Sequence, residues 1–595
     1  MKRDLKRVIS LFVCATLLFS VGCGGGDSGN GHTHVFDQQV VESQYKKSDA
    51  TCTEAAQYYY SCVCGEKGSE PFSMGIKAFH SYTAEKAEAQ YLKDGANCQS
   101  PAVYYKSCVY CGKNSGSDLL TFTAGEVGTH AYTEEKATAE YLKYEATFDS
   151  AAVYYKSCAC GLKGGEDATF SYGAPLRELT DEEKIAYQPI SLTMTLYDVE
   201  NSVYGFTWNT QNNPLRAVIQ YEKGETLTEN AQEVGVDTTK ESYYNDTDTD
   251  KIYYYVSKAE LKLEPNTTYT YRVYDKYAQI GTEAVTFQTK DTKSTSFSFA
   301  HVSDTQSVPS SGANFATVLK RIVGENDFVL HTGDIVEYSK YESEWTDMLH
   351  TNFAYLSKVP LMAVSGNHDT TYKSGYNELW KHFNNNIPEQ TSTGNGYYYS
   401  FTYGNAKFIM LNTNNNGSSR LEEAQYKWVE NELKNNTCDW TFVAMHAPLY
   451  SIGQWGADSN KNYQSLALRA QLQGLFAEYG VDIVFQGHDH LLSRTKPIDM
   501  DGNPTVETWQ TEDGVEYSVD PNGVLYVMDG MVGTNSKSVI ATEEELEKYY
   551  RNAQSSAQCT WAEITINGNE LIFEVKYTSG STDYPYYTWG IKKTA

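Results

Sequence analysis

Basic residues are scarce in this chain of 595 residues. Lysine and arginine together number 48 against 76 aspartates and glutamates, which gives a formal net charge of −28. A surface this acidic repels phosphate backbones at long range, so no nucleic-acid-binding surface is expected. Disorder of the whole chain is excluded too, because 40% of the residues are hydrophobic and 13% are aromatic. At roughly 150 residues per domain, the length predicts about four domains.

Long apolar runs are also missing, with one exception at the N-terminus. Four basic residues precede the run Val8 to Val21, which ends at Gly22-Cys23. This run is too short for a comfortable membrane span, and it predicts a secretory signal over residues 1–22. Its end resembles a bacterial lipoprotein signal, which implies lipidation of Cys23, with residues 23–31 as a flexible tether. The alternative is a plainly cleaved signal with Cys23 an ordinary thiol. We therefore expect an exported protein, either held at the cell surface by a lipid anchor alone or secreted.

A threefold repeat occupies residues 32–79, 80–129 and 130–175. Each unit opens with a histidine that is followed two residues later by an aromatic residue, and each closes with Cys-Gly. The shared segments of the VYYKSC type predict short strands with turns between them. The candidate ligands of the first two units are His34, Cys52, Cys62 and Cys64, then His80, Cys98, Cys108 and Cys111.

One histidine and three cysteines in a unit fit a tetrahedral structural zinc site within that unit. The third unit has Phe148 where the others have Cys52 and Cys98, so it is expected to lack a ligand. Outside the cell the same cysteines could instead form disulfides, and the sequence leaves both alternatives open. The pattern resembles the Cys/His repeats of secreted bacterial surface proteins, which implies a stalk or an adhesive role.

Residues 187–290 alternate short apolar runs with turn residues and show no helical pattern. Regular short strands of this kind predict a β-sandwich. The stretch Leu261 to Asp275, with its leucine, proline turn and tyrosines, resembles the end of fibronectin type III domains. It holds no cluster of nucleophiles or ligands, so we expect a packing or spacer domain.

Between residues 295 and 577, apolar runs alternate with amphipathic helical segments, which predicts a layered α/β domain. Helices are expected over 313–324, 420–434 and 465–479, and 578–595 is expected to be a C-terminal tail. Polar side chains follow the apolar runs at six places: Asp304, Asp334, Asn367, His446, His488 and His490. Because loops converge at the carboxyl ends of strands in α/β sheets, we expect a site there.

Five short segments of this region, in this order, carry a family resemblance. They are D-x-Q at 304–306, GD at 333–334, GNHD at 366–369, V-x-M-H-A-P-x-Y at 443–450 and GHDH at 487–490. They resemble the motifs of the calcineurin-like metallophosphoesterase superfamily, and within it the purple-acid-phosphatase-like branch. The resemblance implies an α/β sandwich of two central sheets flanked by helices. With the β-sandwich and the small β-rich repeats before it, the whole chain is expected to be multidomain.

The same resemblance implies a site with two metal ions. Asp334 would bridge the two ions, and His368 would assist the leaving-group oxygen, with Asp369 orienting its ring. The remaining ligands would be Asp304 and His490 on the first ion, and Asn367, His446 and His488 on the second.

Three positions depart from the family pattern or match it loosely. Glu337 stands where purple enzymes have the tyrosine that colours ferric iron, and Gln306 stands where other members have a histidine. Both are candidate ligands of the first ion. Arg494 follows GHDH at the spacing of a family arginine, and it is either a substrate contact or a solvated surface residue. These departures predict a colourless enzyme that uses two divalent ions, Mn, Zn or Fe.

The implied chemistry is hydrolysis of phosphate monoesters or diesters outside the cell by a metal-bound hydroxide. Two ions can hold the attacking and the leaving oxygens of an in-line displacement at phosphorus. The expected partner is a small phosphate ester. The alternative is a cell-surface binding or adhesion protein whose phosphoesterase fold is inert.

Overall fold

The computed structural model describes residues 33–146, 150–175, 179–244, 250–306, 311–371, 376–388, 397–414 and 419–594. The described residues form two compact units. One contains those up to Tyr132 together with Cys158–Leu162, and the other contains Thr133–Ser157 and those from Lys163 onward. The signal, Cys23 and Phe148 lie outside the described residues. No helix within the described ranges is long and apolar enough to cross a membrane.

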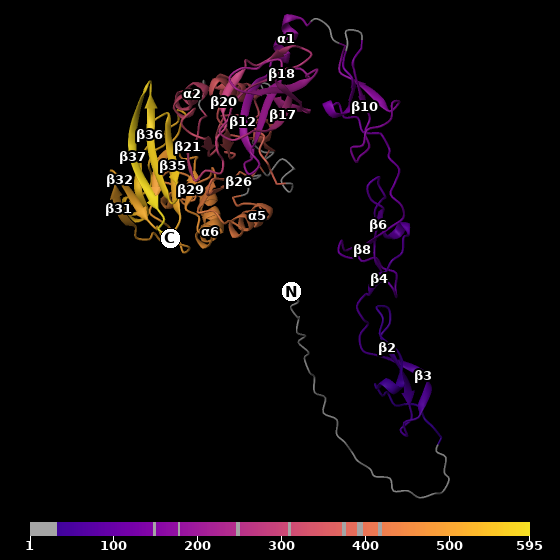
Figure 1. Cartoon of the computed structure of the whole chain (residues 1–595). Helices are drawn as coiled ribbons and strands as arrows, with labels where there is room; N and C mark the ends of the chain where they lie inside the picture. Colours follow the sequence, from indigo (N-terminus) through magenta and orange to yellow (C-terminus); the bar gives the residue numbers. More distant parts are fainter. Residues whose placement is uncertain are drawn as a thin grey trace. The chain divides into compact units, whose positions relative to one another are not determined.

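Each repeat contains one small three-stranded antiparallel sheet (Figure 1). The sheets are preceded by the 3-10 turns η1 (Ser43–Tyr45), η2 (Ala89–Tyr91) and η3 (Ala139–Tyr141), each of which buries its tyrosine. The strands are β1 (Lys46–Ser48), β2 (Ala56–Ser61) and β3 (Lys67–Met74); β5 (Leu92–Asp94), β6 (Ala102–Tyr105) and β8 (Thr121–Ala124); and β9 (Leu142–Tyr144), β10 (Ala152–Tyr155) and β11 (Thr169–Tyr172). A separate pair joins β4 (Tyr82–Ala84) to β7 (Ser107–Cys108).

Helix α1 (Asp181–Tyr187) leads into a sandwich of two antiparallel sheets. Thr180 begins the helix with a capping box, because its hydroxyl and the Glu183 side chain satisfy each other's backbone amides. One sheet consists of β12 (Ile190–Asp198), β13 (Val203–Thr210), β17 (Lys251–Lys262) and β16 (Thr238–Tyr244). The other consists of β15 (Gln232–Gly235), β14 (Ala217–Lys223), β18 (Thr268–Asp275) and β19 (Ile280–Gly281), with β20 (Val285–Gln288) also paired to β18.

The sandwich packs directly on the domain that follows it. The Thr193 hydroxyl on β12 donates a hydrogen bond to the carbonyl of His382, and the Tyr271 hydroxyl donates to the Ser357 carbonyl at 2.7 Å. Phe206 of the sandwich belongs to the same hydrophobic core as the strands of the next domain. The sandwich is therefore a packed support for the C-terminal domain.

Two large sheets form the C-terminal domain, as predicted. The eight-stranded sheet has the order β23 (Leu361–Ala363), β22 (Phe328–His331), β21 (Ser296–Val302), β35 (Thr560–Asn567), β36 (Glu570–Ser579), β37 (Thr582–Lys592), β32 (Val515–Val519) and β31 (Thr508–Glu512). The seven-stranded sheet has the order β26 (Tyr399–Tyr403), β27 (Ala406–Met410), β28 (Trp440–Ala444), β29 (Ile483–Gln486), β33 (Leu525–Asp529), β30 (Leu491–Thr495) and β34 (Tyr550–Ser555). A short pair, β24 (Thr370–Thr371) and β25 (Tyr376–Asn377), stands apart from both sheets.

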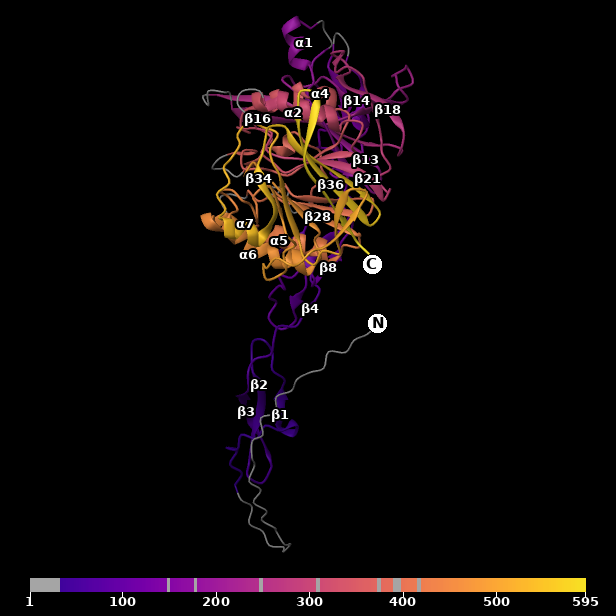
Figure 2. The same ribbon diagram turned by 90° about the vertical axis from the view of Figure 1, so that its left-hand side faces the viewer.

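Aromatic side chains hold the two large sheets together. The ring of Phe299 on β21 lies 5.2 Å from that of Phe408 on β27 and 5.8 Å from that of Phe485 on β29. Helices cover the outer faces: α2 (Ser311–Ile322), α3 (Glu342–Thr351) and α4 (Phe353–Leu356) join the core of the eight-stranded sheet. Helices α5 (Glu423–Lys434) and α6 (Tyr463–Glu478) share a core with the seven-stranded sheet and lie close together in Figures 1 and 2. Helix α7 (Glu543–Tyr549) packs beside β34, the last strand of that sheet. The predicted helices correspond to α2, α5 and α6, so the expected fold class is confirmed.

The predicted C-terminal tail is wrong, because residues 582–592 form strand β37. This strand pairs antiparallel with β36 and parallel with β32, so it lies inside the eight-stranded sheet. Trp589 and Ile591 are buried, and the Trp589 ring stacks on Phe573 at 4.9 Å. The aromatic residues of this segment are therefore core residues of the domain.

Candidate metal centre

The six predicted ligands converge where parallel strands of both sheets end. Strands β21, β22 and β23 run parallel in one sheet, and β28 and β29 run parallel in the other. Asp304 follows β21 by two residues, Asp334 follows β22 by three, and His446 and His488 each follow their strands by two. The sequence pattern of strand followed by polar residue therefore places these side chains at one rim.

Four of these residues have a backbone conformation that residues other than glycine rarely adopt. Asp304, Asp334, His488 and His490 have φ angles of 51°, 55°, 80° and 52°, in the left-handed region. Such strain is concentrated at functional sites, where the surrounding structure enforces it. The loop that carries Gly366 approaches the loop that carries Asp334 so closely that only glycine fits there. A Cβ atom at residue 366 would lie 2.1 Å from the backbone nitrogen of Asp334.

The first group of ligands consists of Asp304, Asp334 and His490. Their ligand atoms all lie within 4.8 Å of one another. His490 Nε2 is 3.3 Å from Asp304 Oδ1, and its Nδ1 donates to the carbonyl of Asn535. That backbone contact fixes the ring so that Nε2 faces the carboxylates.

The second group contains the same Asp334 with His446 and His488. His446 Nε2 lies 3.2 Å from Asp334 Oδ2, 3.1 Å from His488 Nδ1 and 3.0 Å from the side-chain oxygen of Asn367. His446 Nδ1 donates to Thr332 O at 2.8 Å, which again leaves Nε2 for the cluster. The Asp334 carboxylate is therefore common to both groups.

The donor set fits two metal ions. Carboxylate oxygens and imidazole nitrogens suit divalent ions such as Zn, Mn and Fe(II), and ring nitrogens held by backbone carbonyls are typical of metal-binding histidines. Gln306 lies against the cluster, because its Nε2 donates to Asp334 Oδ2 at 3.2 Å, and its buried Oε1 has no hydrogen-bond partner.

Electrostatics in the cluster favour added positive charge. Burial is the largest influence on Asp334 and works to raise its pKa, but the charge and hydrogen bond of His446, together with the charges of His368 and His488, lower that pKa. Burial likewise works to lower the pKa of His446, whereas the charge and hydrogen bond of Asp334, the charge of Asp304 and the Thr332 carbonyl together raise it. Burial, with the charge of His446, lowers the pKa of His488 to about 3. His488 therefore presents a neutral ring, which is the form that binds a metal.

His368 lies beside this cluster, and its orienting partner differs from the predicted one. Its Nδ1 donates to the backbone carbonyl of Glu337 at 2.9 Å, which turns Nε2 away from that loop. Asp369 does not orient the ring. Its fully buried carboxylate accepts from the amides of Ile335 at 2.9 Å and Gly366 at 2.8 Å. Asp369 therefore fastens the GNHD loop to the loop that carries Asp334, because its carboxylate accepts hydrogen bonds from amides of both loops.

A cavity of about 180 Å³ opens onto the cluster. Sequence reasoning missed three of its lining residues: Trp455, Asn535 and Lys537. The Trp455 ring lies 4.6 Å from that of His488. Lys537 is exposed in the loop after β33 and belongs to no motif, so no sequence signal marked it.

Arg494 is neither a substrate contact nor a solvated surface residue. It is buried, it donates to Glu507 from both terminal nitrogens at 2.6 and 3.2 Å, and it lies over the Trp589 ring at 4.2 Å. It does not line the cavity. The contacts with Glu507 and with Trp589 of β37 hold the Arg494 side chain in the interior of the domain, so its role is structural.

The repeats also bring their predicted ligands together, but not unit by unit. Cys52 groups with the second unit's His80, Cys108 and Cys111. Likewise, Cys98 groups with the third unit's ligands, His130, Cys158 and Cys160, whereas the first unit's His34, Cys62 and Cys64 form a group of three. The interpretation with a complete site within each of the first two units is therefore wrong, because the first cysteine of a unit extends to the next one.

Known proteins resemble the C-terminal part of this chain. The family profile described as calcineurin-like phosphoesterase matches residues 297–492. Purple acid phosphatase 23 of Arabidopsis thaliana is 26% identical over 320 residues, which are 46% of this chain and 61% of that protein. A nucleotide pyrophosphatase/phosphodiesterase of Hordeum vulgare is 25% identical over 281 residues, 44% of this chain and 71% of that protein. The chain thus spans less than two thirds of the Arabidopsis relative.

A solved structure shows the same fold. A purple acid phosphatase isolated from yellow lupin (Lupinus luteus) seeds aligns with a TM-score of 0.55 and 19% sequence identity, over 68% of this chain and 75% of that one. The convergence of Asp and His side chains at the strand ends lies within the segment that the family profile matches. Residues 297–492 of this chain are therefore similar to the calcineurin-like phosphoesterase family, and the fold is that of the lupin enzyme.

Proposed function

We propose that this site hydrolyses phosphate monoesters or diesters with two bound divalent metal ions. The observation that carries the proposal is the Asp334 carboxylate, which belongs to two groups of metal-ligand side chains beside one cavity. Bound there, the two ions would supply an activated water and neutralise the charge of the phosphate. The similarity to a purple acid phosphatase and to a nucleotide pyrophosphatase/phosphodiesterase supports both ester classes.

The residues divide into holders of the two ions and groups that face substrate. Asp334 would be shared, Asp304 and His490 would hold the first ion, and the second would be held by Asn367, His446 and His488. Gln306 is a further candidate for the first ion through its unpartnered Oε1. This division follows the two groups in which the ligand atoms lie.

Lys537 is proposed to bind the phosphate of the substrate, and His368 is proposed to assist the departure of the alcohol. Lys537 supplies a positive charge at the cavity, where a phosphate anion needs one. The Glu337 carbonyl holds His368 Nδ1, so Nε2 is the ring atom left to exchange a proton with the leaving-group oxygen. A cavity of about 180 Å³ suits a small ester.

The metal-loaded protein is proposed to be colourless, with Mn, Zn or Fe(II). Glu337 lines the cavity at the place where purple enzymes have a tyrosine. The adjacent Tyr338 is 49% exposed, does not line the cavity and packs on Tyr341. No tyrosine lines the described part of the cavity, so no phenolate is available to colour a ferric ion there.

The site is proposed to act outside the cell. The basic and apolar segment over residues 1–22 and the Gly22-Cys23 junction support export with a lipid anchor. A Cys23→Ser variant is expected to move the protein from the membrane fraction to the soluble fraction. Retention of the variant in the membrane fraction would contradict the anchor.

A substrate assay tests the activity. The full chain, loaded in turn with Mn, Zn or Fe(II), is assayed with p-nitrophenyl phosphate and bis(p-nitrophenyl) phosphate. We expect turnover of at least one ester, and loss of it in Asn367→Ala but not in Asn435→Ala, an exposed residue next to α5. Absence of turnover with all three ions would favour the inert, surface-binding alternative.

A further inference from the structure

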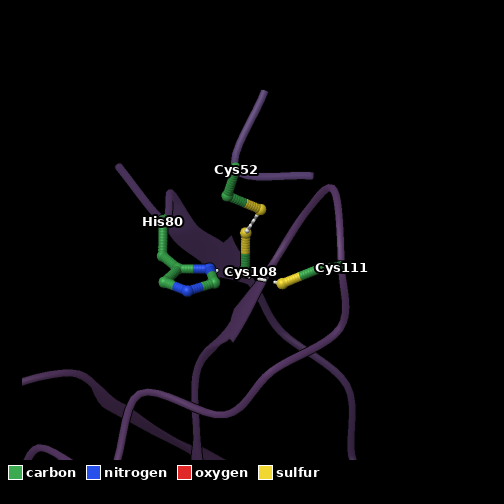
Figure 3. Close-up of side chains that lie close together, drawn as sticks. All are labelled: Cys52, His80, Cys108 and Cys111. Atoms are coloured by element: carbon green, nitrogen blue, oxygen red, sulfur yellow. Dashed lines mark hydrogen bonds between the residues drawn. The ribbon is translucent and has the colours of Figure 1, made fainter. Parts of the chain in front are cut away.

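The cysteine cluster of the second repeat contains a ligand from the first. Cys52 Sγ lies 3.4 Å from Cys108 Sγ, and Cys111 Sγ lies 3.3 Å from His80 Nδ1. All four ligand atoms lie within 4.8 Å of one another. Figure 3 shows the four side chains pointing toward a common centre, with Cys52 approaching from its own segment of chain.

The next pair of repeats has the same arrangement. Cys98 of the second repeat lies 3.0 Å, sulfur to sulfur, from Cys158 of the third, and Cys160 Sγ lies 3.5 Å from His130 Nδ1. The segment Cys158–Leu162 belongs to the same compact unit as the residues up to Tyr132, whereas Thr133–Ser157 of its own repeat belong to the other unit. The pattern is therefore a property of each junction between consecutive repeats.

Local structure holds the other three ligands of each cluster. The Gly112 amide donates to the Cys108 carbonyl at 2.9 Å, and Gly112 has a φ of 71°, which explains the Cys-Gly ending of each unit. The His80 ring stacks on Tyr82 at 5.5 Å, which explains the aromatic residue two positions after each histidine. The recurrent sequence features thus build a three-ligand half-site that the preceding repeat completes.

We propose that each junction between consecutive repeats binds one zinc ion, with Cys52 and Cys98 as the ligands supplied by the preceding repeat. Three thiolates and one imidazole are a common tetrahedral set for structural zinc. Sulfur separations of 3.0 and 3.4 Å are longer than the ~2.05 Å of a disulfide bond. They are short enough for one ion to bind both sulfurs through bonds of about 2.3 Å.

The sequence at both ends of the array agrees with this assignment. The third unit has Phe148 at the position of Cys52 and Cys98, and no fourth unit follows it before the β-sandwich. A cysteine at that position would have no partner half-site. At the other end, His34, Cys62 and Cys64 form a group of three, and residues 1–31 contain no further unit.

Zinc would compensate for the small hydrophobic cores of these repeats. The buried side chains of the first repeat are Tyr45, Ser61, Cys62 and Phe72, and the core cluster of the third contains Tyr141, Ala146, Ala152 and Tyr154. Units of fewer than about 50 residues rarely fold on so little buried surface without metals or disulfides. A shared ion would also fix each repeat to its neighbour, because the bond to Cys52 or Cys98 crosses the junction.

Alkylation of the full chain tests the assignment cysteine by cysteine. Protein purified with zinc and without reductant is treated with N-ethylmaleimide before and after chelation, and labelled peptides are measured by mass spectrometry. We expect Cys52, Cys108 and Cys111 to become reactive only after chelation, and Cys98, Cys158 and Cys160 likewise. Partly exposed Cys438 lies in no cluster and should react in both cases. Thiols that need a reductant instead of a chelator would be disulfides and would overturn the proposal.

Two variants separate sharing between repeats from sites within repeats. In Cys52→Ser, Cys108 and Cys111 should lose their protection while Cys62 and Cys64 behave as in the unaltered chain. In Cys98→Ser, protection should be lost at Cys158 and Cys160 and retained at Cys108 and Cys111. Loss at Cys62 and Cys64 in the first variant, or at Cys108 and Cys111 in the second, would show sites within repeats. The two variants check each other, since general unfolding would expose every cysteine in both.

Discussion

The two kinds of ligand cluster in this molecule differ in donors, support and access. The cluster between the large sheets uses oxygen and nitrogen donors, whereas the repeat clusters are mostly sulfur. Asp304 and Asp334 are buried in a large domain, where Asp334 lines a cavity, whereas Cys64 and Cys111 are exposed on units with few buried side chains. A large core can hold strained ligands beside an open position, which reaction requires. A small unit gains most from a closed site that uses every ligand to hold the chain.

Removal of metal should produce the largest difference between the two regions. A mild chelator is expected to reduce phosphoesterase activity to background, because the oxygen and nitrogen ligands lie beside an open cavity. The thiolates should stay protected from N-ethylmaleimide at the same chelator concentration, and added Zn or Mn should restore activity. Loss of activity and loss of thiol protection at the same chelator concentration would contradict the expected difference between the two kinds of cluster.

Replacement of the shared carboxylate should be the most damaging single substitution. Asp334→Ala is expected to lower kcat/KM by about 10³-fold, since both ions lose a ligand and transition-state stabilisation of several kcal/mol goes with them. The protection of the repeat cysteines should be unchanged. Asp347→Asn, on the exposed side of α3, is the control and should leave kcat/KM unaltered.

Substitution of His368 should affect turnover without affecting metal content. His368→Asn is expected to lower kcat by about 10²-fold with a smaller change in KM, because proton transfer to the leaving group contributes on that scale. Esters with better leaving groups should be less sensitive. The exposed His350 of α3 provides the control His350→Asn. Equal losses for good and poor leaving groups would argue against a proton-transfer role.

Lys537 should show the smallest effect. Lys537→Gln is expected to raise KM about five-fold to ten-fold, as a charge-assisted hydrogen bond to phosphate is lost at a partly solvated site. Lys427→Gln on α5 is the control. It should leave KM unchanged, since Lys427 pairs with Glu423 and does not line the cavity. An unchanged KM in Lys537→Gln would remove this residue from the substrate site.

The sequence was sufficient to predict elements and local ligand placement. Apolar runs followed by Asp or His marked the strand ends, and the helical periodicity located α2, α5 and α6 within a few residues. Both signals are local, because strand alternation and helix periodicity depend on neighbouring residues. The positions of Asp304 and Asp334 directly after apolar runs were therefore enough to place both carboxylates at one rim.

What the sequence did not predict depends on contacts between distant segments. Asp369 lies next to His368 in sequence, yet its carboxylate binds amides of another loop. Arg494 has the spacing of a substrate residue but pairs with Glu507. Spacing fixes where a residue lies along the chain, whereas the partner is chosen by tertiary packing.

The cysteines illustrate the same limit most clearly. Each of the first two units offers one motif histidine, His34 or His80, and three cysteines, so counting within a unit gives a complete site. The structure divides the same residues differently, because the turn before β2 brings Cys52 to the next unit's half-site. In this arrangement the last unit needs no cysteine at the position of Cys52 and Cys98, and Phe148 stands there.

A ligand passed from one unit to the next gives the array a direction and makes its length adjustable. Insertion of a copy of the middle unit would add one donor and one acceptor half-site, so every cysteine would still have a place. Deletion of the last unit would remove the three ligands that group with Cys98, and the Cys98 thiol would be left unprotected and reactive. Gain or loss of middle copies could therefore vary the number of repeats before the β-sandwich and the C-terminal domain without any compensating mutation.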